Sequence, residues 1–198
     1  MDLDSFIRQF EVLKLDERPH HQGSLLLHLT NVARLLQDWG CEEHVFRAGF
    51  CHSLFGTSYY QDAPLELREI DSWKNVIDEK TLRLVHLFRS MNRKMFMEAA
   101  AALVGSESAA PAIWSSETQR LEAVTRQEVI DLLHILLANT IDHERGVLDP
   151  RQWYRGMGFL KTLPLLLPSA AQQIRQTYPV LQTEKPRALV LLGASGPS

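Results

Sequence analysis

Apolar residues recur along most of the chain at three- and four-residue spacing, which is the period of an amphipathic helix. Sustained alternation of apolar and polar residues is not found in the sequence, and neither are Asn-Gly or Asp-Gly hairpin signals. The pattern therefore predicts an all-α fold. We expect a single-domain helical bundle over residues 1–183 and a flexible C-terminal tail over residues 184–198.

Apolar stripes and capping residues set the ends of the expected helices. Thr125-Arg-Gln-Glu128 is a capping box that opens a strongly apolar helix, and Asp149-Pro150 and Ser169 are expected to start two later ones. We expect helices over residues 4–15, 24–39, 42–55, 79–91, 125–141, 150–163 and 169–178. Two segments are expected to be loops, the first crossing the mouth of any ligand pocket: residues 57–72 and 105–118.

The composition narrows the classes of partner. The chain has 198 residues and a formal net charge of −3, and its Lys and Arg residues are scattered among Asp and Glu. No block of basic residues is present that could follow a phosphate backbone, so we do not expect a nucleic-acid partner. A small-molecule ligand is the expected partner, and the sequence does not indicate an oligomeric state.

The positions of the cysteines and the lengths of the apolar runs indicate in which cellular compartment the protein is expected. Cys41 and Cys51 are the only cysteines, they do not form a Cys-x-x-Cys pair, and both fall in expected helices rather than in loops. The first residues lack the pattern of a signal peptide, and no apolar run reaches the length of a membrane span. We therefore expect a cytoplasmic protein that does not associate with membranes.

Two histidines lie on the apolar sides of consecutive expected helices. His28 stands beside Leu25 and Leu29, and His52 shares a face with Gly49. A buried neutral imidazole needs a partner for its bare nitrogen, because an unsatisfied acceptor costs about 1–3 kcal/mol. A single such histidine is commonly a core residue that donates to a backbone carbonyl. As a pair, His28 and His52 predict one shared metal or catalytic pocket.

The other histidines receive plainer interpretations. We expect His20 and His21 to be solvated in a turn, with the alternative that His21 faces the same pocket. His44 is expected to be exposed. His86 and His134 fall inside apolar helical runs, so we expect them to be packed and hydrogen-bonded.

Several features together resemble the HD-domain superfamily. They are the spacing from His28 to His52, the Val32-Ala33 pair, and the Ala48-Gly-Phe-Cys-His52 run. The helix, polar connection and helix that follow resemble the alarmone hydrolases, and Leu137-Ala-Asn-Thr-Ile-Asp-His143 resembles the helix that supplies their last aspartate ligand. The resemblance covers roughly residues 18–146. It implies an HD-like helical bundle and hydrolysis at a metal-bound water.

The carboxylate ligands of the HD superfamily are replaced in this chain. Ser53 stands where the family has the aspartate after the second histidine, and Asn139 stands where it has the late aspartate. The acidic pair of the alarmone hydrolases falls at Gly56 and Thr57. Because Mn²⁺ and Mg²⁺ rely on anionic oxygen ligands, the usual ligand set of the family is not present.

One hypothesis restores a metal site with other ligands. Asp142 and His143 follow Asn139 by three and four residues, so they lie close to its face of the helix. His28, His52, Asp142 and His143 would form a nitrogen-rich set for a divalent metal, Zn²⁺, Fe²⁺ or Mn²⁺. An open position would let a bound water be activated or O₂ bind.

A second hypothesis needs no metal. His52 would act as general acid or base, while a polar ligand is held by Ser53, Thr57, Asn139 and a hydroxyl of Tyr59 or Tyr60. Three functions follow from these arrangements. The first is an HD-like protein that binds or hydrolyses a small polar metabolite, phosphorylated metabolites included. The second is a catalytically inactive binding or scaffold module. The third is a non-haem iron oxygenase, as in the branch that includes myo-inositol oxygenase.

Overall fold

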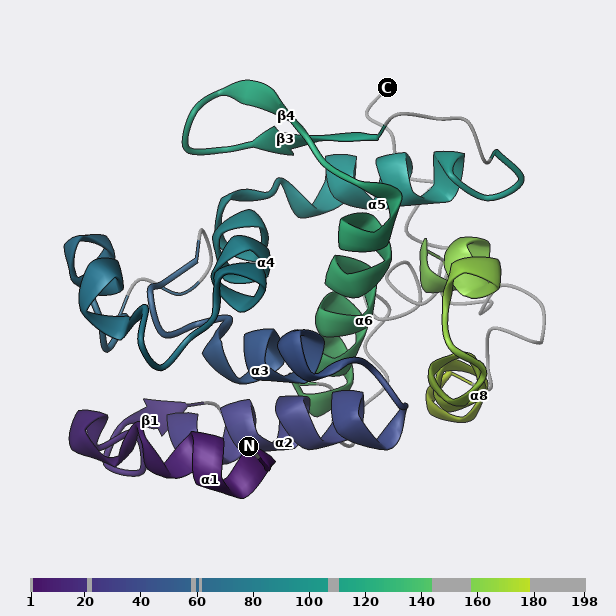
Figure 1. The fold of residues 1–198 in the computed structure, drawn as a ribbon. Helices are drawn as coiled ribbons and strands as arrows, with labels where there is room; N and C mark the ends of the chain where they lie inside the picture. Colours follow the sequence, from purple (N-terminus) through teal and green to yellow (C-terminus); the bar gives the residue numbers. More distant parts are fainter. Residues whose placement is uncertain are drawn as a thin grey trace, which may run out of the picture.

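The structure, a computed structural model, is mostly helical (Figure 1). It describes residues 2–20, 23–57, 60, 62–106, 111–143 and 158–178. The predicted all-α fold is wrong in one respect, because the chain also forms two small antiparallel sheets of two strands each. The proposed tail over residues 184–198, the end of the proposed domain and the Asp149-Pro150 helix start all lie outside the described residues.

The N-terminal third forms three helices. Helix α1 (Leu3–Arg8) is followed by a short 3-10 helix, Glu11–Leu13, so the single helix expected over residues 4–15 is wrong. Lys14 ends this segment in the left-handed region, with φ of 50°, which an α-helix cannot continue through. Helices α2 (Leu25–Asp38) and α3 (Glu43–Cys51) lie within the segments that their apolar stripes predict.

Three further α-helices and a 3-10 helix build the middle of the molecule. The 3-10 helix, Leu67–Trp73, occupies part of the segment 57–72 that was expected to be a loop. Helix α4 (Glu79–Ser90) lies where it was expected, whereas α5 (Arg93–Ala102) was not predicted because its run of alanines gives no apolar stripe. Helix α6 (Arg126–His143) is the longest described element and lies at the centre of Figure 1, in contact with α2, α3, α4 and α5. It is therefore buried along most of its length.

The start of α6 confirms the predicted capping box. The Glu128 backbone N–H donates to the Thr125 hydroxyl at 3.1 Å, and the Thr125 N–H donates to the Glu128 carboxylate at 2.6 Å. These two bonds satisfy backbone donors that the first helical turn leaves open.

Two hairpins correct the prediction of an all-helical chain. Strands β1 (Pro19–His20) and β2 (Gly23–Ser24) lead directly into α2. Strands β3 (Ala112–Ser115) and β4 (Arg120–Ala123) occupy part of the segment expected to be a loop. Both hairpins have strands of four residues or fewer, too short to show a period of two.

The C-terminal described segment packs beside α6. Residues 158–162 are helical and lead through a 3-10 helix, Leu163–Leu165, into α8 (Pro168–Thr177). A helix was expected here, but Ser169 does not cap it. The Ser169 hydroxyl instead donates to the Trp39 carbonyl at 2.7 Å and so ties α8 to the end of α2.

The contact between α2 and α3 depends on a glycine. A Cβ placed on Gly49 would lie 2.2 Å from Cδ1 of Leu36, so no larger residue fits without displacing α2. Gly49 therefore lets the two helices approach closely. Because His28 is on α2 and His52 follows α3, the close approach also brings the two imidazoles toward each other.

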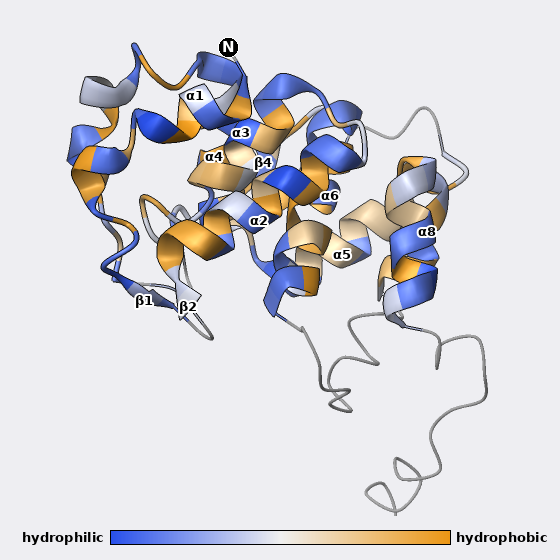
Figure 2. Cartoon of the chain, turned by 90° about the horizontal axis from the view of Figure 1, so that it is seen from below, coloured by the Kyte–Doolittle hydropathy of each residue, from blue (hydrophilic) through white to orange (hydrophobic). Residues whose placement is uncertain are grey.

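Hydropathy follows the packing of the helices. Apolar side chains line the sides of α2, α3, α4 and α6 that face one another, and charged residues occupy the outer sides (Figure 2). Within the described residues, the helices are all too short or too polar to cross a membrane.

Candidate metal and ligand site

His28 lies on the buried side of α2, with 5% of its surface exposed. The helix begins at Leu25 because the Ser24 hydroxyl accepts the Leu27 N–H at 3.3 Å. Nδ1 of His28 is 2.7 Å from Oδ2 of Asp142, which lies near the end of α6. A carboxylate oxygen only accepts, so Nδ1 carries the proton and Nε2 of a neutral His28 is a bare acceptor.

His52 follows α3 directly and is 1% exposed. Its Nδ1 lies 2.7 Å from the Gly49 carbonyl oxygen, which again can only accept. The proton of a neutral His52 therefore resides on Nδ1, and Nε2 can only accept. The ring also packs edge-on against Phe88 of α4, with centroids 5.1 Å apart, and this contact restricts its rotation.

The two bare nitrogens face each other. Nε2 of His28 and Nε2 of His52 are 3.4 Å apart, and the ring planes are inclined by 74°. Two lone pairs at this separation repel unless a cation lies between them, either a proton on one ring or a metal ion. The structure therefore brings together the two histidines that the sequence singled out, at a distance that calls for a shared positive charge.

The protonation of His52 is set by its surroundings. Burial and the neighbouring His28 lower the pKa of His52 to about 3, although its bonds to Gly49 and Asn139 act in the opposite direction. His52 is therefore neutral near pH 7, and its lone pair is available to a cation.

The separation of the two nitrogens suits metal coordination. Two imidazole nitrogens about 2.1 Å from one ion at a tetrahedral angle lie about 3.4 Å apart. The observed distance is 3.4 Å. Histidine ligands of metals commonly donate the other ring N–H to a carboxylate or a carbonyl, and His28 and His52 each do so.

The remaining predicted residues surround this pair. Asn139 is 2% exposed and hydrogen-bonds to His52 from α6, so it occupies the position expected for a residue that orients a ligand or water. Oδ2 of Asp142 bonds to Nδ1 of His28, so this oxygen is not directed at the two Nε2 atoms. Ser53 is buried, and its carbonyl accepts the Gly56 N–H in the turn that ends α3.

A group of three histidines adjoins the pair. His20, His28 and His143 each offer a nitrogen, and these nitrogens lie within 4.8 Å of one another, so the group can hold a metal ion. The ring of His143 stacks on His28 with centroids 4.4 Å apart, and His20 lies 4.6 Å from His28. The sequence hypothesis included His143. It placed His20 in solvent, which is wrong, because the β1–β2 hairpin folds this half-buried residue over the start of α2.

Tyr60 borders the same histidines. Its ring contacts His20 edge-on, with centroids 5.2 Å apart, and its hydroxyl is buried with no hydrogen-bond partner within the described part of the chain. Burial is the main cause that raises the pKa of Tyr60, so the phenol keeps its proton and can donate to a ligand. Tyr59, the other hydroxyl considered, lies outside the described residues.

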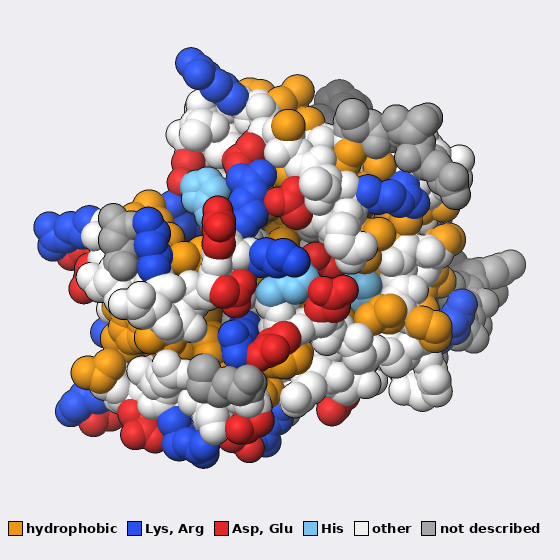
Figure 3. Space-filling view, in the orientation of Figure 1, with side chains coloured by type: hydrophobic (Ala, Val, Ile, Leu, Met, Phe, Trp, Pro, Cys, Tyr) orange, Lys and Arg blue, Asp and Glu red, His pale blue; other side chains and the backbone are white. Residues whose placement is uncertain are grey.

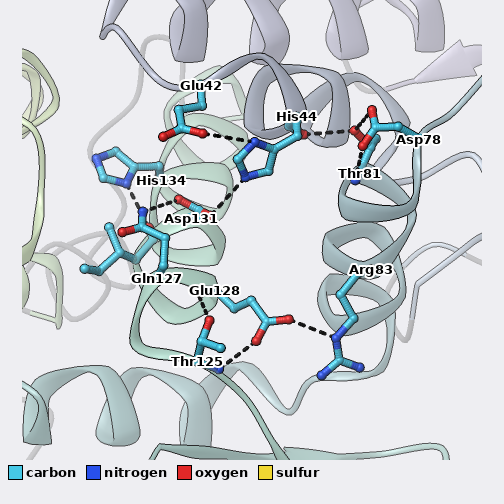
Figure 4. Close-up of polar contacts among 11 residues, drawn as sticks. Glu42, His44, Asp78, Thr81, Arg83, Thr125, Gln127, Glu128, Asp131 and His134 are labelled. Atoms are coloured by element: carbon cyan, nitrogen blue, oxygen red, sulfur yellow. Dashed lines mark hydrogen bonds and ion pairs between the residues drawn. The ribbon is translucent and has the colours of Figure 1, made fainter. Parts of the chain in front are cut away.

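A second polar cluster lies on another part of α6 (Figure 4). His44 of α3 has Nδ1 3.4 Å from Glu42 and Nε2 3.3 Å from Asp131, and its side chain is only 17% exposed. The expectation that His44 is exposed is therefore wrong. Gln127 donates to the other Asp131 oxygen at 2.8 Å. We call Glu42, His44, Gln127 and Asp131 the His44 cluster.

His134 confirms its interpretation as a packed residue. Its Nδ1 is 2.8 Å from the Ile130 carbonyl, and its Nε2 accepts the Leu167 N–H at 3.0 Å. Both nitrogens are thus occupied by backbone groups, and His134 has no nitrogen left for a ligand.

Charges around the His44 cluster are mixed in sign. The face of α3, α4 and α6 shown in Figure 3 carries acidic and basic side chains close together, with histidines between them. Arg83 of α4 contributes by pairing with Glu122 and Glu128. No single sign dominates this face, so it offers no broad field for a highly charged partner.

The cysteines are not activated nucleophiles. Burial raises the pKa of Cys41 to about 12, and the nearby Asp131 acts in the same direction. Burial also raises the pKa of Cys51, which is fully enclosed. A thiol reacts as its thiolate, so neither residue is poised for covalent catalysis near neutral pH.

Comparison with known proteins gives one match. Residues 10–93 match the model of a family described as a domain of unknown function (DUF6817). The match includes both His28 and His52 but ends before α6, which carries Asn139, Asp142 and His143. No curated protein and no solved structure matches the chain.

Proposed function

We propose that this protein is an HD-like metal-dependent protein that binds a small polar metabolite and hydrolyses it at a site centred on His28 and His52. The observation that carries the proposal is the pair of bare Nε2 atoms, 3.4 Å apart. Their Nδ1 atoms are already committed to Asp142 and to the Gly49 carbonyl. The two Nε2 atoms are therefore the ring nitrogens that we assign to the metal.

The donor set favours a particular class of metal. Ser53 and Asn139 replace the carboxylates of the HD pattern, so the nitrogens of His28 and His52 dominate the site. Imidazole suits Zn²⁺ and Fe²⁺ better than Mg²⁺. A bound divalent metal would supply a Lewis acid that lowers the pKa of a coordinated water toward neutrality.

The residues around the metal position have separate roles in this proposal. Asp142 fixes the tautomer and orientation of His28, and Gly49 does the same for His52. Asn139, hydrogen-bonded to His52, orients the water or the ligand. The Tyr60 hydroxyl, buried and protonated, donates to a polar group of the metabolite.

The test is calorimetric titration of the purified, chelator-treated chain with Zn²⁺, Fe²⁺ and Mn²⁺. We expect about one metal per chain for Zn²⁺ or Fe²⁺, and a loss of at least about 100-fold in affinity in His28→Ala and His52→Ala, since even outer partners of a metal ligand contribute 10–100-fold. His44→Ala is the matched control and should bind as the unchanged protein does. A stoichiometry below about 0.1 under metal-replete conditions would remove the metal site, because preorganised ligands normally fill.

The metal-free alternatives are tested by thermal shift. A ligand that binds only the folded chain raises the melting temperature according to RT ln(1 + [L]/Kd). A nucleotide and sugar-phosphate panel that stabilises the protein equally with and without metal would favour acid–base catalysis by His52. No shift with any metal or metabolite would favour the inactive scaffold. Oxygen consumption that requires Fe²⁺ and a substrate would favour the oxygenase.

A further inference from the structure

We propose that His20 and His143 join His28 and His52 to form an all-imidazole shell around one ion, which makes the site selective for Zn²⁺, Co²⁺, Ni²⁺ and Cu²⁺ over Mg²⁺ and Mn²⁺. This inference rests on the proposed function, because it assumes a metal at the pair of His28 and His52. It assigns a role to His20, which neither the HD resemblance nor the sequence pattern selects.

The other three rings lie around His28. Nitrogens of His20, His28 and His143 lie within 4.8 Å of one another, and His52 is linked to this group through His28, whose Nε2 lies 3.4 Å from Nε2 of His52. The rings of His20 and His143 are 5.4 Å apart between centroids. Each ring comes from a different part of the fold, so no single helix pattern in the sequence reveals the group.

Each side chain is held in place by its own element. Strand β1 presents His20, and the pairing of Pro19 with Ser24 fixes that strand against the start of α2. The Leu25 N–H also donates to the Arg18 carbonyl at 2.8 Å, which secures the base of the hairpin. His143 is the last described residue of α6, one position after Asp142.

Packing alone does not explain four imidazoles in one place. At His28 and His52, which are buried, an aliphatic or aromatic side chain would fill the same volume without bringing ring nitrogens out of water, where each needs a partner. The chain has also replaced two carboxylate positions of the HD pattern, at Ser53 and Asn139, by neutral groups. Two additional imidazoles restore the number of ligands while changing their type from oxygen to nitrogen.

The angles between the ring planes predict that His20 and His143 contribute unequally to metal affinity. His143 stacks on His28 with planes inclined by only 26°, so its in-plane lone pair must turn to reach an ion that His28 also holds. His20 is inclined by 36° to His28 and 48° to His143 and needs a smaller rotation. Both side chains are half-buried, which leaves room for the movement. We therefore expect His20 to contribute more to affinity than His143.

The experiment compares Zn²⁺, Co²⁺ and Mn²⁺ binding by calorimetry in the full chain and in His20→Ala, His20→Gln, His143→Ala and His86→Ala. The visible absorption of bound Co²⁺ reports the coordination number independently of any activity. We expect Zn²⁺ to bind at least about 100-fold more tightly than Mn²⁺, and His20→Ala to weaken Zn²⁺ binding by at least about 10-fold. His86 is a half-buried histidine of α4 outside this group, so His86→Ala should change neither measurement.

The outcomes separate this inference from the proposed function. If the unchanged protein binds Zn²⁺ and both His20 variants and His143→Ala bind it equally well, the four-histidine shell is wrong and the site at His28 and His52 stands. If the unchanged protein binds no metal, both proposals fail. His20→Gln keeps a polar side chain in the hairpin, so a loss of affinity with an unchanged melting temperature in that variant supports a ligand role even if His20→Ala unfolds.

Discussion

Two groups in this molecule contain histidines shielded from solvent, namely the pair of His28 and His52 and the His44 cluster. The two groups differ in the partners of their ring nitrogens. In the His44 cluster one imidazole lies between two carboxylates, so both ring nitrogens have acceptors when the ring is protonated. In the pair, each ring has one acceptor for Nδ1, and the two remaining nitrogens face each other. One proton completes the first arrangement between two anionic acceptors, whereas in the second a proton or a metal ion would lie between two ring nitrogens.

The difference shows how a structural histidine can be told from a ligand-binding one. Burial does not separate them, because His134 is 2% exposed and has backbone partners on both nitrogens. What separates them is the partner of Nε2, because Nε2 of His134 accepts a backbone N–H whereas Nε2 of His28 faces the Nε2 of another histidine. By this criterion His44 and His134 stabilise the packing of α6, and His28 and His52 are available to a metal.

Among the residues around the pair, the largest effect is expected at Asp142, whose removal would break the orientation of His28. Asp142→Ala should weaken Zn²⁺ binding by about 10–100-fold, as is typical when the hydrogen-bond partner of a metal-bound histidine is lost. Asp142→Asn keeps an acceptor for Nδ1 and should recover part of the loss. The measurement is calorimetric titration at constant pH. Equal affinities in all three proteins would mean that Asp142 does not act through His28.

The next effect concerns the His44 cluster and should appear in stability alone. His44→Gln removes the imidazole that lies between Glu42 and Asp131, and we expect a loss of about 1–2 kcal/mol in the free energy of unfolding, less than for a fully buried pair because the site is partly exposed. Urea unfolding of the chelated protein measures it. A change in Zn²⁺ affinity comparable to that of His52→Ala would contradict the separation of the two clusters.

A smaller effect should follow from restoring a carboxylate beside His52. Asn139→Asp puts an anionic oxygen at the position where the HD pattern has its late aspartate, and we expect about a 10-fold gain in Mn²⁺ affinity because hard divalent metals favour such ligands. Asn139→Gln is the neutral control. If Asn139→Asp binds Mn²⁺ no better than this control, position 139 does not face the metal.

The smallest effect is a pH dependence of stability at His134. Burial lowers the pKa of His134, so the unfolded chain takes up a proton near pH 6.5 that the folded chain refuses. Stability from this group is present above pH 6.5 and is lost as the pH falls toward the lowered pKa, by at most about 1.4 kcal/mol per pH unit. His134→Gln retains an acceptor for the Leu167 N–H, and should unfold with a shallower slope between pH 7 and 5. The same slope in both chelated proteins would show that His134 does not titrate in this way.

Much of the helical frame was predictable because it depends on local signals. The capping box at Thr125 and Glu128 forms as expected, and the apolar stripes locate α2, α3 and α4 to within a few residues. Helix α5 and both hairpins were missed, since a run of alanines has no stripe and strands of two to four residues have no measurable period. The HD-like assignment of this frame stays a prediction.

The sequence by itself determined where α2, α3, α4 and the start of α6 lie, and that His28 and His52 stand on the apolar sides of consecutive helical segments. Only the tertiary structure decided which nitrogen of each ring is left bare, because that depends on Asp142, 114 positions away from His28 in the chain. It also decided that His20 joins the site and that His44 is held by Asp131. Helix periodicity is a local property, whereas the partners of a ring nitrogen are set by elements that meet only after folding.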